Sequence, residues 1–262
     1  MFRFYFLLNY VLIFMLHYIF LLLSFFERVF AYALGKGYGR GSIRQENHLI
    51  YKLLGRSAVV AIDVGANIGE YTAELRRIYP DAEIHSFEPS CTNIELLNSR
   101  FLLDYRIVIV PAGLANCASS ATLYSDLPGS GLGSLTLRDL SHVGRVFSFQ
   151  EVVQTIRFED YWTEKLNSRR IDIIKLDIEG HELDALHGIG EAIRQTCIIQ
   201  FEFGVCNIDT RTYFRDFWIF FNLNNFSLYR MTPFGVDKIV GYRESDEFFS
   251  TTNYIATNNE FI

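Results

Sequence analysis

The stretch that decides the fold is Val59-Val60-Ala61-Ile62-Asp63-Val64-Gly65-Ala66-Asn67-Ile68-Gly69. Its first half is a short apolar, β-branched run, which is typical of a buried parallel strand. Gly65 and Gly69 then mark a tight turn, and residues 70–79 continue with a helical pattern. Glycine suits a turn where the backbone approaches a ligand closely, because it has no side chain and tolerates positive φ. Ligands of open α/β sheets bind at this carboxyl end of a strand, so Asp63 is a candidate site residue.

A second strand is predicted at residues 82–88, and it ends in Glu88. Glu88 follows the glycine turn by about twenty residues, the place where nucleotide-binding sheets carry an acid that accepts hydrogen bonds from ribose hydroxyls. The glycine spacing alone fits a dinucleotide site, a phosphate cradle or merely a close strand-to-helix turn. Together, the turn and the acid indicate a cofactor that contains a nucleoside.

The chain has 262 residues, half of them hydrophobic, and a formal net charge of −6. This length suits one large α/β domain with an appendage. The acidic balance argues against a general nucleic-acid binder, which would be basic, so we expect no nucleic-acid partner. The four cysteines lack the spacing of metal ligands and are interpreted as buried thiols of a reducing compartment.

Residues 4–26 are almost wholly apolar. A helix of that length would cross the hydrocarbon layer of about 30 Å, so a single transmembrane helix is predicted. Arg3 alone lies before this segment, whereas four basic residues follow it, namely Arg28, Lys36, Arg40 and Arg44. The positive-inside bias therefore predicts a single-pass membrane protein with its large domain in the cytoplasm.

Two alternatives remain for this segment. Ala31-Tyr32-Ala33 resembles a signal-peptidase site, although the apolar core is longer than that of a usual secretory signal. The many Phe and Tyr residues would also suit a helix that lies in the membrane interface. We divide the chain into a hydrophobic helix (1–27), a basic, glycine-rich linker with an edge helix (28–54), and the main domain (55–262).

The second informative stretch is Ile171-Asp172-Ile173-Ile174-Lys175-Leu176-Asp177-Ile178-Glu179-Gly180-His181-Glu182. A central parallel strand should be apolar on both faces, yet this one carries charges near its end. Period-two alternation projects Lys175 and Asp177 to one side, and Glu179 with them if the alternation continues. The next predicted strand, 196–203, carries Gln200 and Glu202 near its own end. If the two strands are neighbours, these polar groups converge at the ligand side of the sheet.

A purely structural interpretation of this cluster stays open. Lys175 would then only neutralise Asp177 or Glu202, and Glu179 would cap a helix. His181 and Glu182 would lie in a solvated first turn. A divalent cation bound by Asp177, Glu179 and Glu202 is a further alternative, although we expect no metal.

The remaining pattern continues the alternation of strands and helices. Strands are predicted at 107–110, 118–124 and 151–156, and two closing strands at 227–231 and 250–256. The glycine-rich loop 127–133 is either a substrate cover or a plain surface loop.

Three of these motifs together resemble the FkbM-type methyltransferase family: residues 63–69, Phe87-Glu88-Pro89 followed by Asn93, and residues 174–182. The resemblance covers residues 59–256. It implies a Rossmann-like class I methyltransferase fold, with a seven-stranded, mostly parallel sheet, helices on both faces and an antiparallel last strand. It also implies S-adenosylmethionine as cofactor and, usually, O-methylation. The apolar N-terminal helix precedes the family domain.

On the matched positions, one set of residues is expected to bind the cofactor: Asp63, Gly65, Ala66, Asn67, Ile68, Gly69, Tyr71, Thr72, Glu88, Pro89, Asn93 and Asp177. A hydroxyl acceptor must lose a proton during methyl transfer, which calls for a base within hydrogen-bond reach. Asp177 and His181 are the candidate bases, with Lys175 orienting the carboxylate and with Glu179 and Glu202 beside them.

We therefore expect a membrane-tethered methyltransferase that acts on a hydroxyl of a small molecule, a glycan or a glycolipid precursor. Two alternatives come from other classes. An NAD-dependent oxidoreductase is disfavoured because the turn lacks the Gly-x-Gly-x-x-Gly pattern. The second alternative is a non-catalytic module that binds a nucleoside in the same pocket but transfers no group. The sequence does not indicate the oligomeric state.

Overall fold

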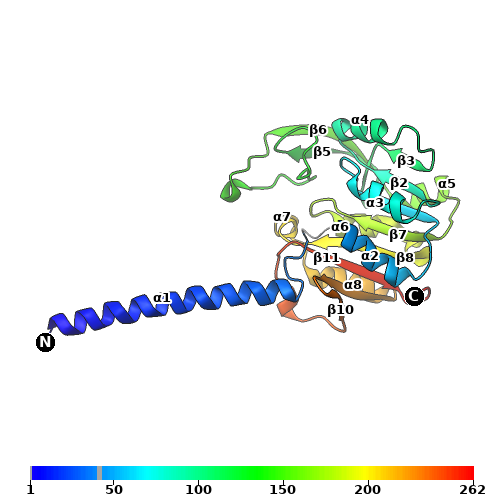
Figure 1. Cartoon of the computed structure of the whole chain (residues 1–262). Coiled ribbons are helices and arrows are strands. Elements are labelled where there is room, and N and C mark those ends of the chain that lie inside the picture. The colour runs from blue at the N-terminus through cyan, green and yellow to red at the C-terminus, as the bar shows by residue number, and fades with distance from the viewer. Residues whose placement is uncertain (1, 40–42) are drawn as a thin grey trace.

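The computed structural model describes residues 2–39 and 43–262, with side chains from residue 14 onward. A long helix, α1, projects from an α/β domain (Figure 1). The helices are α1 (Phe2–Ala33), α2 (Ile43–Leu54), α3 (Glu70–Ile78), α4 (Cys91–Arg100), α5 (Phe158–Lys165), α6 (Glu182–Ile189), α7 (Cys206–Thr210) and α8 (Phe214–Leu223), with 3-10 turns η1 (Ser141–Val143), η2 (Gly190–Gln195) and η3 (Glu244–Asp246). The strands are β1 (Val60–Val64), β2 (Glu83–Phe87), β3 (Ile107–Val110), β4 (Gly113–Leu114), β5 (Ser119–Ser125), β6 (Phe149–Ile156), β7 (Ile171–Leu176), β8 (Thr196–Phe203), β9 (Phe226–Thr232), β10 (Gly235–Ile239) and β11 (Thr252–Asn258).

The main sheet has the strand order β10-β9-β11-β8-β7-β1-β2-β3. The five strands from β8 to β3 run parallel to one another. The last strand, β11, runs antiparallel between β8 and β9. These are the seven strands expected from the sequence, and the prediction is confirmed. β10, which the sequence pattern did not reveal, pairs with β9 as a hairpin and makes the sheet eight-stranded.

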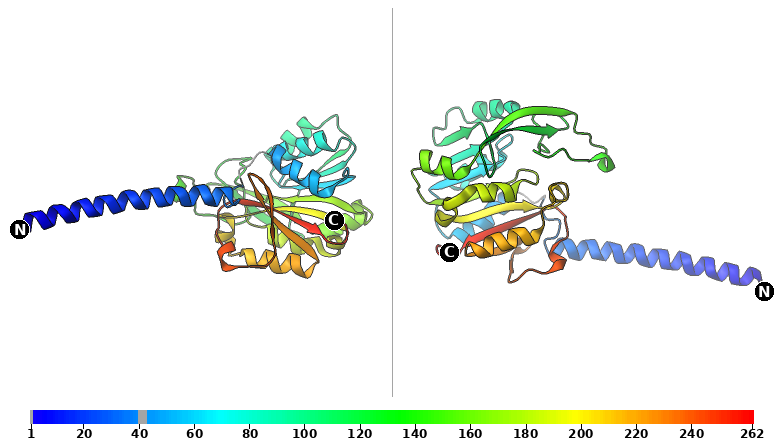
Figure 2. Two further views of the ribbon diagram at one scale, coloured as in Figure 1. Left: turned by 60° about the horizontal axis from the view of Figure 1, so that its bottom comes forward. Right: turned by 180° about the vertical axis from the view of Figure 1, so that it is seen from behind.

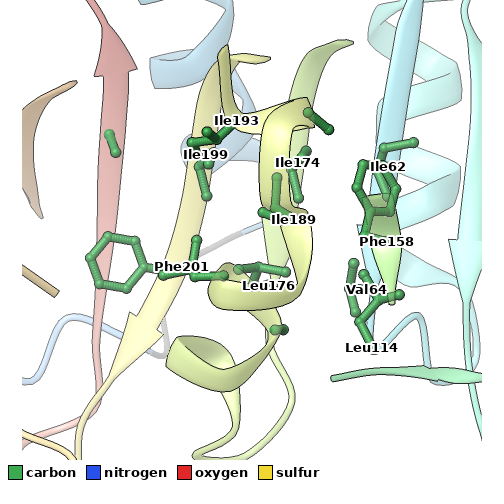
Figure 3. Close-up of a cluster of buried hydrophobic side chains, with 14 of the residues drawn as sticks. Ile62, Val64, Leu114, Phe158, Ile174, Leu176, Ile189, Ile193, Ile199 and Phe201 are labelled. Atoms are coloured by element: carbon green, nitrogen blue, oxygen red, sulfur yellow. The ribbon is translucent and has the colours of Figure 1, made fainter. Parts of the chain in front are cut away.

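The central strands β1 and β7 are buried at every position, although Asp63, Asp172 and Lys175 interrupt their apolar runs. Alternate residues point to opposite faces, so Ile62, Ile174 and Ile199, which are paired across β1, β7 and β8, lie in one cluster. Figure 3 shows them with Phe158 of α5 and Ile189 of α6. The other face packs against α2 and α3. Helices cover both faces of the sheet. A ligand can therefore reach the charged strand ends only at the edge where the parallel strands end.

The helix α2 covers a face of the sheet and not its edge. It packs on α3 and β8 and buries Leu49, Ile50 and Leu54. The sequence-based expectation of a helix at the edge of the domain is therefore wrong. The apolar residues of α2 repeat with helical spacing and form one face, which packs on the sheet next to α3.

A smaller sheet, β4-β6-β5, lies beside the carboxyl end of the main sheet. It carries the long connection between β5 and β6, residues 126–148, which extends away from the domain on the same side as α1 (Figure 1). The predicted extended segments 118–124 and 151–156 are β5 and β6. This arrangement places the glycine-rich part of the connection near the tips of β1, β2 and β7.

The helix α1 continues through Ala33, beyond residue 27 where we expected the linker to begin. Its part from Phe14 to Ala33 is long and apolar enough to cross a membrane by length and composition, with a mean hydropathy of 1.6 and no residue buried. Of the basic residues used to predict orientation, the Arg3 side chain and Arg40 lie outside the described parts of the chain.

Candidate active site

A hollow lies at the carboxyl ends of β1, β2 and β7. The turn after β1 forms one wall, Glu88 to Asn93 another, and the start of the loop after β7 a third. Residues of the connection 126–148 close the hollow from above, so the glycine-rich loop covers the site and is not a plain surface loop. The lining residues are Val64, Gly65, Asn67, Glu88, Pro89, Ser90, Asn93, Gly113, Leu114, Leu123, Ser125, Gly129, Ser130, Gly131, Gly133, Leu135, Phe149, Glu151, Asp177, Ile178, Glu179 and His181.

The turn after β1 requires glycine for a structural reason. Gly65 has a φ of 78°, and a Cβ atom there would overlap the backbone oxygen of Asp177. The tips of β1 and β7 therefore approach so closely that no side chain fits between them. Gly69, also at positive φ, packs against Leu97 and Phe101 and faces away from the hollow.

The amides of this turn are used within the protein. The N–H groups of Gly65 and Ala66 donate to the carbonyl of Phe87, and that of Asn67 donates to the Glu88 carboxylate (2.8 Å). Gly69 N–H donates to the Ala66 carbonyl. A phosphate cradle needs free, convergent N–H groups, so this interpretation of the glycine spacing is wrong. Of the groups expected to hold a ligand, only the carbonyls of the turn and the side chain of Asn67 therefore remain available.

Glu88 lies on the hollow's wall, where its position in the sequence predicted it. Its two oxygens accept hydrogen bonds from the amides of Asn67 (2.8 Å) and Ser90 (2.9 Å). Burial raises the pKa of Glu88, and these backbone bonds partly offset the rise. The carboxylate is thus fixed in place, with lone pairs left for a ligand's hydroxyl groups.

Three buried oxygens on residues that line the hollow lack a hydrogen-bond partner in the described chain: Asn67 Oδ1, Ser90 Oγ and Asn93 Oδ1. An unsatisfied buried acceptor costs about 1–3 kcal/mol, so such atoms point to a ligand that supplies donors. The hydroxyl and amino groups of a nucleoside are donors of this kind. The residues present therefore fit the predicted nucleoside-containing cofactor.

Lys175 links the ends of β1 and β7. Its Nζ lies 3.6 Å from Asp63 and 3.2 Å from Asp177. Burial alone would lower the pKa of Lys175, but Asp177 and Asp63 raise it above its ordinary value. The lysine is therefore a fixed cation. The predicted convergence of Lys175 and Asp177 is found, and the side chain of Lys175 orients the carboxylate.

Three residues that we expected to contact the cofactor lie behind the hollow. Asp63 is fully buried and accepts a hydrogen bond from Thr72 Oγ1 (2.6 Å). Tyr71 donates to Gln200 (2.6 Å), which in turn donates to Glu46 of α2 (2.8 Å). Asp63, Tyr71 and Thr72 thus support Lys175 from beneath and do not line the wall, because they point to the face covered by α2 and α3. Ala66, Ile68 and Gly69 do not line it either.

Sequence reasoning missed Glu46, and it placed Gln200 among the polar strand ends without a partner. Burial raises the pKa of Glu46, and the Gln200 hydrogen bond partly offsets the rise. The available signal was an acid at a buried position of α2, whose apolar positions repeat with helical spacing. The polar chain Glu46, Gln200 and Tyr71 connects α2 to the floor of the site.

Asp177 and His181 both line the hollow, and so remain the candidate bases. The Asp177 side chain is 42% exposed, the most open of the charged groups around Lys175. The Nε2 atom of His181 lies 3.0 Å from Thr136 Oγ1 in the covering loop. Burial lowers the pKa of His181, and Asp184 partly offsets this, so the imidazole is neutral at neutral pH and can accept a proton.

Glu179 does not join Lys175 as expected. It sits at positive φ and pairs with Arg138 of the covering loop (2.6 Å), and it accepts a hydrogen bond from Cys206 (2.9 Å). The strand ends at Leu176, so the period-two alternation no longer applies at Glu179. This side chain fastens the loop over the site, together with Asp209, which also binds Arg138 (3.0 Å).

Glu202 lies on β8, opposite Asn253 of β11, and outside the hollow's lining. Burial and the nearby charges of Asp177 and Glu179 raise the pKa of Glu202 well above its ordinary value, which places it beside the cluster as expected. In the described residues no group of three His, Cys, Asp or Glu side chains is arranged to hold a metal ion.

The cysteine prediction is partly wrong. Cys197 and Cys206 are buried, but Cys91 and Cys117 are exposed, and all four are free thiols. Cys91 begins α4 and Cys117 lies in the loop before β5, so both are beside the core and not inside it.

The hollow is electrostatically suited to a cation. Four carboxylates line it, namely Glu88, Glu151, Asp177 and Glu179. Asp177 pairs with Lys175 and Glu179 with Arg138, whereas Glu88 and Glu151 have no ion-pair partner in the described chain, so the lining stays net acidic. Opposite charges attract across such a poorly solvated site, whereas a second anion is repelled. A sulfonium ligand is therefore favoured and a pyrophosphate is disfavoured, which argues against the NAD alternative.

Glu182 lies behind the loop after β7 and is buried, contrary to the solvated first turn considered above. Its oxygens accept hydrogen bonds from the amides of Ile178 (2.9 Å) and Gly180 (3.1 Å). Burial raises the pKa of Glu182 to about 7, with the backbone bonds partly opposing it. The carboxyl group thus fixes the loop that carries Asp177 and His181.

This raised pKa predicts a loss of stability with rising pH. The folded state holds the Glu182 proton more tightly than the unfolded chain, so the free energy of unfolding should fall between pH 4.5 and 7, by up to roughly 3 kcal/mol. Glu182→Gln, which is always neutral, should flatten this slope in thermal melts of the full chain in detergent. Glu164→Gln, an exposed site on α5, is the matched control and should leave the slope unchanged.

The strand order and the antiparallel last strand are those of a class I methyltransferase fold, and the acidic hollow lies at the carboxyl ends of its parallel strands. The methyltransferase FkbM domain family matches residues 63–228, more than half of the chain, and the chain belongs to this family. Membership in this methyltransferase family identifies S-adenosylmethionine as the cofactor.

Two fungal relatives are similar over half of the chain. "Methyltransferase 1" of Beauveria bassiana (strain ARSEF 2860) is 26% identical over 147 residues, which are 50% of this chain and 58% of the relative. "Methyltransferase sdnD" of Sordaria araneosa is 28% identical over 155 residues, 50% of this chain and 60% of the relative. The chain therefore spans less than two thirds of these relatives.

Among solved structures, the O-methyltransferase from Bacillus cereus in complex with SAH aligns with a TM-score of 0.44 and 12% identity, covering 84% of this chain and 83% of that one. The O-methyltransferase TomG from Streptomyces achromogenes in complex with SAM aligns with a TM-score of 0.45 and 10% identity, covering 84% and 82%.

Proposed function

We propose that this protein is a membrane-tethered, S-adenosylmethionine-dependent O-methyltransferase that acts on a hydroxyl of a glycan or glycolipid precursor. The observation that carries the proposal is the acidic hollow, whose wall includes the two candidate bases, Asp177 and His181. The tether α1 supports an acceptor made at the membrane, with the catalytic domain on the cytoplasmic side. The division into residues 1–27, 28–54 and 55–262 is part of this proposal.

The residues of the hollow have distinct proposed roles. Glu88, Pro89 and Asn93 hold the nucleoside, while Gly65 and Asn67 lie beside the methionine part. S-adenosylmethionine supplies a methyl group that is already activated by the positive sulfur, so the protein must chiefly align the acceptor and exclude water. The connection 126–148 provides this exclusion, because Gly129 and Gly131 pack against Asn93 and Asn67.

The acceptor hydroxyl needs a base to take its proton as it attacks. Asp177 and the neutral imidazole of His181 are the two groups on the wall that can do this. Lys175 holds the Asp177 carboxylate in place, and Glu202 stands behind it on β8. Glu179 acts on the loop through Arg138, so we assign it a positioning role only.

Glu88→Gln should weaken S-adenosylmethionine binding by about ten- to a hundredfold, because a charge-assisted contact to the ribose is lost and an amide N–H₂ now faces a backbone donor. The measurement is calorimetric titration of the full chain in detergent. Glu95→Gln, an exposed position on α4, provides a control with the same loss of charge. Equal affinity in both variants would remove Glu88 from the nucleoside site.

The same titration separates the functional classes. The full chain should give saturable heat with S-adenosylmethionine and none with NAD. Saturable heat with NAD alone would overturn the proposal in favour of an oxidoreductase.

A further inference from the structure

The cofactor site and the tether occupy the same side of the domain. We call this side the catalytic rim: the carboxyl ends of the parallel strands, the connection 126–148, α7 and the turn between β9 and β10. In the views of Figures 1 and 2, α1 leaves the domain in the direction in which the connection 126–148 also extends. The apolar helix α1, which is long enough to enter a bilayer, therefore projects from the side of the domain that carries the catalytic rim (Figure 1).

The joint between α1 and the rim is short and hydrogen-bonded. Gly37 N–H donates to Thr252 Oγ1 (2.9 Å), and Gly39 N–H donates to the carbonyl of Thr251 (2.8 Å). Lys36 Nζ reaches the carbonyl of Ser245 (3.3 Å). Gly35 also abuts the backbone of Met231 so closely that a Cβ atom would overlap it. Residues 34–39 therefore hold the rim to the end of α1 and are not a loose spacer.

The charges of α1 set the height of the rim above the bilayer. Between residue 4 and Ala33 the only charged residues are Glu27 and Arg28, which belong at the membrane surface. From there to the joint the helix rises by about 10 Å, at 1.5 Å per residue. Headgroup layers are about 5–8 Å thick, so a spanning α1 brings the rim to the headgroups.

The rim carries apolar side chains that would suit this position. They are exposed and have no partner within the described chain that would bury them: Leu137, Val143, Val146, Ile208 and Phe234. They lie in the connection 126–148, in α7 and in the β9–β10 turn. Leu103 and Val240 are equally exposed, but they lie at the opposite, amino ends of the strands, next to the starts of β3 and β9.

We propose that the catalytic rim rests on the bilayer and that the acceptor is a membrane amphiphile whose headgroup hydroxyl enters the hollow from the membrane side. The acceptor part of this inference rests on the proposed function, whereas the orientation of the domain does not. We assign a lipid surface as the partner of the rim because the fixed joint to α1 holds the rim next to the bilayer. Apolar side chains typically enter the headgroup boundary by about 5–10 Å, as those of the rim would.

The orientation is tested with tryptophan variants of the full chain in nanodiscs of brominated phosphatidylcholine. Val143→Trp, at a site that is 62% exposed on the rim, should lose roughly half of its added fluorescence relative to unbrominated nanodiscs. Leu103→Trp, at a 95% exposed site on the far side, should lose none. Equal quenching at both sites would overturn the orientation, and this readout does not depend on catalysis.

The acceptor class is tested by incubating the full chain with S-adenosylmethionine labelled on its methyl group and with membranes of the source organism. Label in the lipid-extractable fraction supports a membrane amphiphile. Label only in the water-soluble fraction overturns that acceptor class while leaving the methyltransferase assignment standing. No label in either fraction, in a preparation that binds S-adenosylmethionine, overturns the proposed function and the acceptor class together.

Discussion

Gly65→Ala is expected to abolish cofactor binding, with a loss of affinity of at least about a hundredfold, and to lower the melting temperature. A Cβ atom at residue 65 would overlap the carbonyl oxygen of Asp177, and the φ of 78° is costly for any residue with a side chain. The tips of β1 and β7 would have to separate. Because Lys175 is held between Asp63 on β1 and Asp177 beyond β7, this movement would also disturb the candidate base.

The control for this variant is Gly241→Ala. Gly241 has open space around its Cβ position and no left-handed φ, so alanine should be tolerated there with unchanged affinity and stability. Calorimetric titration with S-adenosylmethionine and a thermal melt of each variant give both quantities. Wild-type affinity in Gly65→Ala would show that the close approach of the two strand tips is not required for the site.

The fold was predictable because its signals are local. Buried parallel strands are continuous apolar runs, and the turn at Gly65 and the acid at Glu88 mark the ends of two of them. β10 was not found, because its residues Gly235–Ile239 pair only with β9 and none of them is buried, so the strand needs no apolar run. In such a hairpin, the turn fixes the register of the strand, and the strand's own sequence shows no apolar pattern.

The candidate site was predicted in part. Period-two alternation correctly placed Lys175 beside Asp177. The contact of Lys175 with Asp63 follows from the pairing of β1 with β7, which the sequence pattern did not predict. Glu179 and Arg138 could not be placed, since both lie in loops where no period applies. Tyr71 and Thr72 were assigned to the ligand because they follow the glycine turn. The first turn of α3 instead directs their side chains toward the sheet, where Gln200 and Asp63 accept their hydrogen bonds.

Asp177→Asn is expected to reduce methyl transfer by about 10²- to 10⁴-fold while leaving S-adenosylmethionine affinity within a few-fold of wild type. Asparagine keeps the shape of aspartate but cannot accept the acceptor's proton. Lys175 keeps its second partner, Asp63, so the floor of the site should remain in place. Asp160→Asn, an exposed position on α5, is the matched control and should keep full activity.

The pH profile decides between the two candidate bases. A base must be unprotonated, and burial lowers the pKa of His181, so a His181-dependent rate should be full at neutral pH and fall only below pH 6.5. If Asp177 is the base, His181→Asn should keep most of the rate, whereas if His181 is the base this variant should lose both the fall in rate below pH 6.5 and most of the rate. Binding without transfer in the wild type itself would instead make the protein a nucleoside-binding module. Substantial transfer by Asp177→Asn with a normal profile would assign proton removal to His181, because that imidazole is the other candidate base on the hollow's wall.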